Sequence, residues 1–329
     1  MKVWFFLMTL RCLLGVLEAA LPGFWNSEPQ INHGSNYPPN HNEQEIRDKI
    51  QKWNSNSGTN IWEHSGLKEG DIMEPKPQKG KNVVRSRSFY WPNAIVPYIL
   101  ESGMSSSHMR IVKSGMDWLM AGSCLKFRPR HSRERDYLYI LSDSAGCWSY
   151  IGRQGGAQAV GLQSNGCFEP GVVAHELLHA VGFLHEQSAT NRDEYIYVNF
   201  TNIEEDKYSQ FMKYNASLIT DYNVGYDYDS LMHYSRKAFS KNGRDTIVPY
   251  QPGVEIGQRS HVSEKDFEKL NFKYCNKTVE AIEQATQSSR PTTRPGTVVK
   301  PSGSKKPGTN TAGRPGGSVG NRPGNNAGG

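Results

Sequence analysis

The stretch that decides the fold runs from residue 175 to residue 186 and reads His-Glu-Leu-Leu-His-Ala-Val-Gly-Phe-Leu-His-Glu. In a helix of about 3.6 residues per turn, His175 and His179 share a face, so both imidazoles can bind one ion. Gly182 provides the backbone freedom to end this helix and turn, which brings His185 back as a third nitrogen ligand. Three protein ligands leave one coordination position open, as is typical of a catalytic zinc site.

Glu176 lies one residue round the helix from the first ligand, close enough to contact a water molecule on the metal without binding the metal. Zinc lowers the pKa of such a water to about 7, and Glu176 would accept its proton and deliver it to the leaving amine of a peptide. Two histidines and a glutamate at this spacing also occur by chance on the surface of a helix. The added Gly182 and His185, followed later by the segment Ser-Leu-Met-His-Tyr at 230–234, make coincidence a poor explanation.

The first 20 residues are predicted to be a secretory signal, because a basic start and an apolar stretch precede the small residues Ala19 and Ala20. Arg11 interrupts the run, which is then too short for the alternative of a membrane anchor. We therefore expect a secreted, extracellular protein without a membrane span. The four cysteines beyond the signal predict two disulfides with three possible pairings: Cys124, Cys147, Cys167 and Cys275. Three Asn-x-Ser/Thr sites are compatible with glycosylation: Asn199, Asn215 and Asn276.

The positive charge is concentrated in the C-terminal segment. Residues 284–329 contain seven basic residues and no acidic ones, and subtracting these seven charges from the net charge of +6 leaves −1. Nothing in the remainder indicates a nucleic-acid-binding surface. Residues 278–329 are rich in Pro, Gly, Ser and Thr and are expected to form a disordered basic tail. This tail either binds extracellular polyanions such as glycosaminoglycans or serves as a solvated spacer.

Apolar periodicity predicts strands first and helices later, which favours an α+β class. Residues 21–81 are polar apart from an amphipathic stretch at Glu43–Trp53, and they cannot form a core of their own. The predicted elements are strands over Ala94–Leu100 and Tyr137–Leu141, a helix capped by Ser107 that buries Val112, Met116 and Leu119, a helix over Val172–Val181, and a last helix that begins with the capping box Ser263–Asp266.

From about Asn82 to Cys275 the protein resembles the astacin family of metzincin zinc metalloendopeptidases, through the extended histidine motif and the methionine segment. The resemblance implies a two-lobed α+β domain with a deep cleft. The upper lobe would contain a mixed β-sheet and the active-site helix, and the lower lobe would be mostly irregular with a C-terminal helix. It also implies one Zn²⁺ per domain and hydrolysis of extended polypeptides in extracellular proteins.

Further roles follow only from this resemblance. Tyr234 would be a phenol near the zinc that stabilises the transition state, and Met232 would form a hydrophobic floor beneath the metal. The alternative for both side chains is ordinary core packing. His233 is interpreted as structural, because a fourth histidine ligand would close the site. The implied disulfide pairs are Cys124–Cys275 and Cys147–Cys167.

The resemblance also implies a latent precursor. No cysteine lies between Cys12 and Cys124, so a pro-segment thiolate cannot block the metal. The family uses the aspartate of a Phe-x-Gly-Asp motif instead, and the matching stretch is Lys68-Glu69-Gly70-Asp71. Asp71 is in place, but Lys68 replaces the aromatic residue. The alternative is a plain Gly-Asp turn on a solvated loop.

Activation would be a cut by a trypsin-like protease at a basic residue before Trp91, for which Lys81, Arg85 and Arg87 all qualify. The family usually has a tryptophan at the tenth mature position, so Asn82 is the expected new terminus. This divides the protein into a pro-segment at 21–81 and a catalytic domain at 82–277. The new amino group is expected to be linked through water to Glu186. The alternative for Glu186 is a surface charge.

Two further interpretations concern binding. Gln154–Gly161 resembles the edge strand of the family, which would pair with an extended peptide, although a glycine-rich surface loop has the same composition. The competing function is a catalytically silent binding module that its basic tail tethers to polyanions. The intact Glu176 argues against this alternative.

Overall fold

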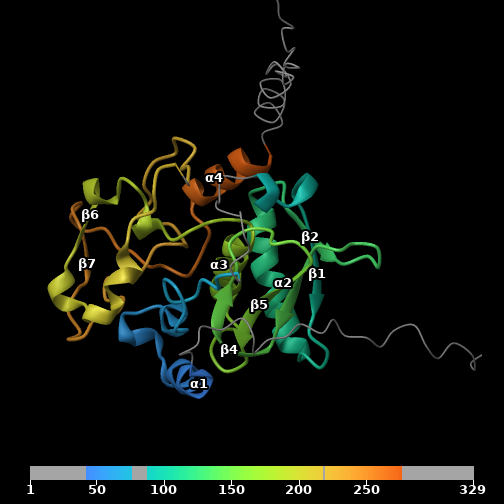
Figure 1. Cartoon of the computed structure of the whole chain (residues 1–329), viewed down its shortest axis with the longest axis horizontal. Helices are drawn as coiled ribbons and strands as arrows, with labels where there is room; N and C mark the ends of the chain where they lie inside the picture. Colours follow the sequence, from blue (N-terminus) through green and yellow to red (C-terminus); the bar gives the residue numbers. More distant parts are fainter. Residues whose placement is uncertain (1–41, 76–86, 218, 276–329) are drawn as a thin grey trace, which may run out of the picture. The chain divides into compact units, whose positions relative to one another are not determined.

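A computed structural model of the protein describes residues 42–75, 87–217 and 219–275 (Figure 1). Figure 1 shows a five-stranded sheet with α2 and α3 in one half of this region and a small two-stranded sheet in the other. Several predictions lie outside the described residues: the signal peptide, Lys81, Asn82 and Arg85, the sequon Asn276 and the tail at 278–329.

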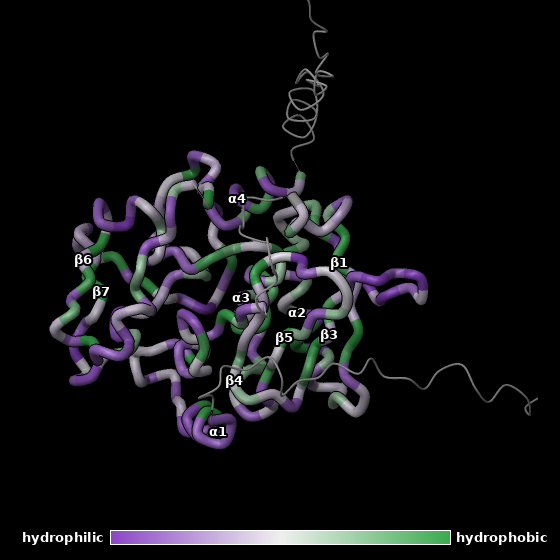
Figure 2. Tube along the Cα trace, viewed as in Figure 1, coloured by the Kyte–Doolittle hydropathy of each residue, from purple (hydrophilic) through white to green (hydrophobic). Residues whose placement is uncertain are grey.

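The large sheet is mixed and has the strand order β2-β1-β3-β5-β4. The first three pairings are parallel, whereas β4 runs antiparallel to β5. All five residues of β3 are buried, as expected for a central apolar strand covered on both faces. Figure 2 shows hydrophobic residues concentrated along these strands. Their bounds are Ile95–Leu100 for β1, Lys126–Pro129 for β2, Tyr137–Leu141 for β3, Asp143–Ser149 for β4 and Ala157–Gln163 for β5.

One prediction about this sheet is wrong. The stretch Gln154–Gly161 does not form its edge: Gly155 and Gly156 have positive φ and lie in a turn, and β5 then enters the sheet between β3 and β4. The edge strand is β4. Glycine content indicated the turn, but sequence alone did not show that the backbone returns to add β5 on the inner side of β4.

Two helices pack together beside the sheet. In α2 (Ser106–Ala121), the buried face contains Val112, Met116 and Leu119, as predicted. Its N-cap is Ser105 and not Ser107, because Ser105 has extended backbone angles and its hydroxyl accepts a hydrogen bond from the N–H of His108 at 3.1 Å. The second helix, α3 (Pro170–Ala180), is buried along almost its whole length.

The other half is mostly irregular and has its own core. The strands β6 (Ile196–Val198) and β7 (Ile247–Pro249) pair antiparallel beside several 3-10 turns. The helix α4 (Glu264–Tyr274) begins with the predicted capping box, in which Ser263 and Asp266 each bond the other's backbone N–H. Leu270 of α4 belongs to the same core as α2 and α3. The α+β class is confirmed. The 3-10 turns are Ser55–Ser57, Ile61–His64, Arg87–Phe89, Pro92–Ala94, Glu186–Ser188, Arg192–Glu194, Phe200–Asn202 and Glu205–Phe211.

Residues 42–75 pack on the rest of the described structure and build no separate core. The helix α1 (Glu43–Lys52) places Ile46 and Ile50 in the main core, where Ile61 and Trp62 also lie. Further along, Met73 donates its N–H to the C=O of Ser149 at 2.9 Å, at the end of the edge strand β4. This segment therefore pairs with the end of the edge strand.

Both disulfides have the pairing that the family resemblance implied, Cys124–Cys275 and Cys147–Cys167. The first joins the end of α2 to the end of α4, and the second joins β4 to the segment before α3. Within residues 42–75, 87–217 and 219–275, no helix has the length and apolar character needed to cross a bilayer.

Loss of the long-range disulfide should destabilise the fold more than loss of the short-range one. The two bonds close loops of 151 and 20 residues, for which loop-closure entropy gives about 5 and about 3 kcal/mol. Unfolding in guanidinium chloride of the two paired Cys→Ala variants measures the difference. A larger loss for the Cys147–Cys167 pair would contradict this order.

Candidate metal centre

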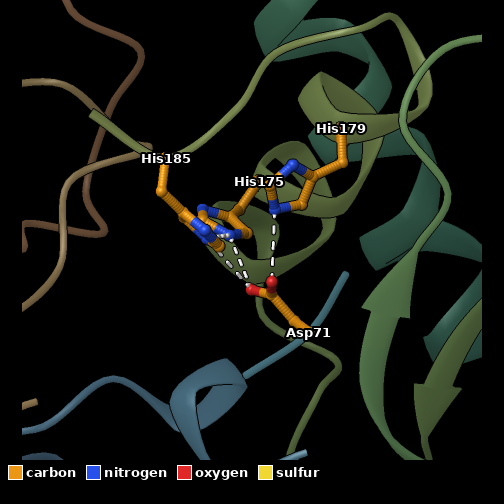
Figure 3. Close-up of side chains that lie close together, drawn as sticks. All are labelled: Asp71, His175, His179 and His185. Atoms are coloured by element: carbon orange, nitrogen blue, oxygen red, sulfur yellow. Dashed lines mark hydrogen bonds and ion pairs between the residues drawn. The ribbon is translucent and has the colours of Figure 1, made fainter. Parts of the chain in front are cut away.

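Three histidine side chains converge on one point with a carboxylate from the N-terminal segment (Figure 3). His175 and His179 come from one face of α3, and His185 comes from the loop that follows it. One ligand atom from each histidine and one from Asp71 lie within 4.8 Å of one another, and all four side chains are buried. The predicted ligand set is therefore brought together, with Asp71 as a fourth member.

The turn after α3 depends on Gly182, whose φ of 97° lies in the left-handed region that glycine adopts without steric cost. Its N–H donates to the C=O of His179 at 2.8 Å, and the N–H of Phe183 donates to the C=O of Leu178 at 3.0 Å. These two bonds end the helix, and the backbone turns back to place His185 beside the first two histidines. The predicted role of Gly182 is confirmed.

Backbone carbonyl groups orient the two histidines of the helix. Nδ1 of His175 donates to the C=O of Leu231, and Nδ1 of His179 donates to the C=O of Phe183, both at 2.9 Å. A proton on Nδ1 leaves the lone pair on Nε2, which faces the centre. This is the tautomer that a metal ligand requires, with the outer acceptor that such histidines usually have.

The third histidine has a different partner. Nδ1 of His185 lies 2.9 Å from Oε2 of Glu69, a buried carboxylate of the N-terminal segment. Sequence reasoning missed Glu69, although it lies only two residues before Asp71. The outer acceptor of this ligand therefore belongs to the predicted pro-segment and not to the catalytic domain.

The carboxylate of Asp71 faces all three Nε2 atoms. Its Oδ2 lies 3.0 Å from His175 and 3.3 Å from His185, and its Oδ1 lies 3.4 Å from His179. Burial raises the pKa of Asp71, but the neighbouring imidazoles of His185 and His179, when they are protonated, outweigh burial and hold the pKa well below 3.8. Asp71 is thus an anion that points at the ligand atoms.

The donor set fits one metal ion. Nε2 of His175 and Nε2 of His185 lie only 3.3 Å apart. Within the described residues, Nε2 of His179 and Oδ1 of Asp71 are buried without a hydrogen-bond partner. Buried polar atoms left unpaired cost free energy, and a cation among them would satisfy these atoms together. Imidazole nitrogens with one carboxylate suit zinc.

Glu176 is buried at the same centre with no hydrogen-bond partner for either carboxylate oxygen in the part of the protein that the structure describes. Burial, and then the negative charge of Asp71, raises its pKa well above 4.5. A carboxyl group that holds a proton readily and has no structural partner is suited to proton transfer.

The methionine segment forms a turn beneath α3. The carboxylate of Asp266 accepts hydrogen bonds from Oγ of Ser230 at 2.7 Å and from the N–H of Leu231 at 2.8 Å. Leu231 in turn accepts the bond from His175, so the capping residue of α4 indirectly supports a ligand. Met232 is buried in the main core. The sequence predicted the cap at Asp266 but not this second role.

Tyr234 is buried beside His185, with the two ring centroids 4.8 Å apart. Its hydroxyl donates to the backbone carbonyl oxygen of Glu69 at 2.6 Å. His233 lies outside the cluster, because its Nε2 bonds the hydroxyl of Tyr226 at 2.7 Å. The phenol is therefore close to the candidate metal ligands and is bonded to the N-terminal segment.

The N-terminal segment at 42–75 is anchored by two residues, Trp62 and Glu63, that sequence reasoning did not identify. Trp62 stacks on the imidazole of His175 with ring centroids 3.9 Å apart. Glu63 is buried and accepts hydrogen bonds from the N–H of Ser235 at 2.9 Å and from its hydroxyl at 3.0 Å. Lys68, which replaces the aromatic of the family motif, is exposed and pairs with Glu74 at 2.9 Å. An aromatic residue in an otherwise polar stretch was the signal that could have revealed Trp62.

Glu186 is buried, so the alternative of a surface charge is wrong. Its carboxylate pairs with Nζ of Lys269 at 2.8 Å and accepts the N–H of Asp227 at 2.9 Å. A cavity of about 300 Å³ borders His185, Glu186 and Lys269. The expected link from Asn82 to Glu186 stays a prediction, since Asn82 lies outside the described residues.

Two of the three predicted glycosylation sites are described. Asn215 is exposed and Asn199 is partly exposed. Each uses its side-chain oxygen to accept a hydrogen bond from the backbone N–H two residues ahead. Attachment of glycans to these residues stays a prediction.

The fold and the centre define the class of protein: a mixed-sheet domain with three histidines on a helix and its following turn, arranged to hold one catalytic metal ion. The sequence matches the model of the astacin peptidase family over residues 83–275, so the chain belongs to the astacin family. Zinc is the cofactor of this family, and the cluster of three histidines and Asp71 is able to hold one metal ion.

Individual relatives agree. The protein is 40% identical over 210 residues to zinc metalloproteinase nas-13 of Caenorhabditis elegans, which covers 64% of this chain and 46% of that protein. It is 37% identical over 221 residues to seminal metalloprotease 1 of Drosophila melanogaster, covering 64% of this chain and 87% of the relative. A solved structure of high choriolytic enzyme 1, a hatching enzyme zinc-protease of Oryzias latipes, matches with a TM-score of 0.54 and 36% sequence identity. The match covers 57% of this chain and 96% of the hatching enzyme chain.

The alignments with several relatives span only part of the longer proteins. They cover 46% of nas-13 and 42% of zinc metalloproteinase nas-14 of the same organism. The relatedness therefore concerns the zinc-binding domain together with the residues around it.

Proposed function

We propose that the protein is the secreted precursor of a zinc-dependent endopeptidase that hydrolyses peptide bonds in extracellular proteins. The observation that carries this proposal is the convergence of three imidazole nitrogens beside the unpaired carboxylate of Glu176. The two disulfides and the family membership support secretion. The predicted signal at residues 1–20 is its sequence basis.

His175, His179 and His185 would hold the zinc ion. When bound, zinc supplies Lewis acidity, which makes a water molecule acidic and polarises a peptide carbonyl. Glu176 would accept the proton of the attacking water and transfer it to the nitrogen of the leaving amine. The hydroxyl of Tyr234, once free of Glu69, would donate a hydrogen bond to the oxygen of the peptide that becomes negative. Met232 would support the histidines through the packed turn.

Latency would come from Asp71, which faces the same Nε2 atoms from the segment that precedes the expected cleavage sites. Its oxygens would exclude a water molecule or a substrate carbonyl from the histidines, and the contacts of Trp62 with His175 and of Glu63 with Ser235 support this by anchoring the segment. Cleavage by a trypsin-like protease after Lys81 would release it and create the amino terminus Asn82. The cavity beside Glu186 and the buried charge of that residue support its role in receiving this terminus.

The basic tail at 278–329 would act outside the catalytic domain, as a tether to polyanions. Its support is the charge distribution alone, seven basic and no acidic residues from 284 onward. Comparing retention of the full-length protein and of a variant ending at Cys275 on heparin at several salt concentrations tests it. Equal elution of the two proteins would contradict it.

Removal of the metal should abolish hydrolysis. The trypsin-processed protein is expected to cleave a quenched casein peptide. A chelator should lower the rate of hydrolysis at least about tenfold, and added zinc should restore the rate, because zinc makes the attacking water more acidic. A serine-protease inhibitor serves as the control and should have no effect after the trypsin is removed. Peptide binding without hydrolysis by the zinc-loaded protein would instead support a silent binding module.

A further inference from the structure

The three candidate ligands differ in where their outer hydrogen-bond acceptors come from. His175 and His179 bond carbonyls at Leu231 and Phe183, which belong to the catalytic domain. His185 bonds the carboxylate of Glu69, which lies before every expected cleavage site. Activation that removes the pro-segment would therefore remove the outer acceptor of one ligand and leave the other two intact.

Two hydrogen bonds of its backbone and a tight turn hold Glu69 in place. Its N–H donates to the side-chain oxygen of Gln210, and its C=O accepts the hydroxyl of Tyr234 at 2.6 Å. Glu69 has a φ of 47° in a tight turn closed by two hydrogen bonds between Leu67 and Gly70. Gly70 has a φ of 87°, and a Cβ there would lie 2.9 Å from Cα of Glu63. The carboxylate thus reaches His185 from a backbone that has little freedom to move.

A carboxylate acceptor on Nδ1 orients an imidazole and increases the basicity of its Nε2, which strengthens the bond to a metal. Carbonyl acceptors orient the ring but carry no full charge. In the described residues, the Nδ1 atoms of His175 and His179 bond backbone carbonyls, whereas Nδ1 of His185 bonds the ionisable side chain of Glu69.

We propose that the pro-segment has a second role besides blocking the cleft: through Glu69 it strengthens zinc binding, so that the precursor acquires and retains zinc more tightly than the processed enzyme. Glu69 is a positioning residue that acts through His185, and Asp71 adds a fourth ligand. The proposal depends on the proposed function, because it requires zinc at the three histidines. Its biological consequence is loading of the metal before cleavage.

The test measures zinc affinity and not activity. Competition with a chromophoric chelator gives the dissociation constant of zinc for the full precursor carrying Asp71→Ala, so that the fourth ligand does not contribute. Adding Glu69→Gln to this background should weaken zinc binding about 10- to 100-fold, the usual effect of losing an outer carboxylate. The matched control is Glu74→Gln, an exposed carboxylate of the same segment that pairs with Lys68, and it should leave the affinity unchanged.

Two further measurements separate the possible outcomes. Glu63→Gln removes a buried carboxylate that anchors the segment at Ser235 without touching a ligand, and an equal loss of zinc affinity there would mean that anchoring alone matters and would overturn the proposal. A processed enzyme that binds zinc as tightly as the Asp71→Ala precursor would also overturn it, and this comparison does not depend on the folding of any Glu69 variant. Absence of stoichiometric zinc in the parent precursor would contradict the proposed function itself.

Discussion

Replacing Glu176 by glutamine is expected to lower kcat/KM of the processed enzyme by a factor of about 10²–10⁴, the usual contribution of a positioned proton-transfer group. Glutamine has nearly the same shape but cannot accept the proton of the attacking water. Since Glu176 has no hydrogen-bond partner in the described structure, the change should break no structural contact. Hydrolysis of a quenched peptide measures the loss.

The zinc content and the unfolding midpoint of this variant should equal those of the parent, because the three histidines are untouched. Glu268→Gln is the matched control: it makes the same chemical change on the exposed side of α4 and should keep full activity. Full activity of the Glu176→Gln variant with zinc bound would assign proton transfer to another group.

Replacing Asp71 by alanine is expected to make the uncleaved precursor active. The charged carboxylate contacts His175 and His185 from the proposed pro-segment, and losing a charged contact of about 1.5–3 kcal/mol should raise the open population about 10- to 100-fold. The experiment uses a precursor in which Lys81→Gln, Arg85→Gln and Arg87→Gln remove the three expected cleavage sites, and Lys79→Gln removes the neighbouring basic residue. Its rate on a short peptide is compared with and without the Asp71 change.

Asp48→Ala is the control, since this acidic residue lies on α1 of the same segment and contacts Gln44 away from the metal centre. It should leave the precursor silent. Trp62→Ala, which removes the stacking on His175, should add to the effect of Asp71→Ala. If the cleavage-resistant Asp71→Ala precursor stayed as inactive as its parent, the remaining contacts of the segment would have to account for latency.

The pairing of β4 with the pro-segment suggests why these contacts act together. Ser149 donates its N–H to the C=O of Asp71 at 3.1 Å and accepts the N–H of Met73 at 2.9 Å. Asp71 is thus bonded to the sheet edge, and Glu69 is bonded to Tyr234. Displacing the segment would free the sheet edge, the phenol and the metal ligands in one event.

Local spacing was enough to predict which side chains meet at the centre. Histidines four residues apart must share a helical face, and a glycine after them permits the turn that returns His185, so these three ligands and Glu176 follow from positions that are close in the sequence. The same holds for the capping box at Ser263 and for the buried face of α2. Family resemblance added the disulfide pairing and Asp71, which spacing by itself left open.

Tertiary contacts alone decided what surrounds these residues. Trp62 stacks on His175, Glu69 bonds His185, and Asp266 supports the turn beneath the helix. The partners in the first two contacts lie more than a hundred positions apart, so no local period in the sequence relates them. The position of β4 at the edge of the sheet likewise depends on which strands pair with each other. Helical periodicity relates residues that are a few positions apart. The hydrogen-bond partners of the histidines and the order of the strands depend instead on how distant segments pack, so only the folded protein shows them.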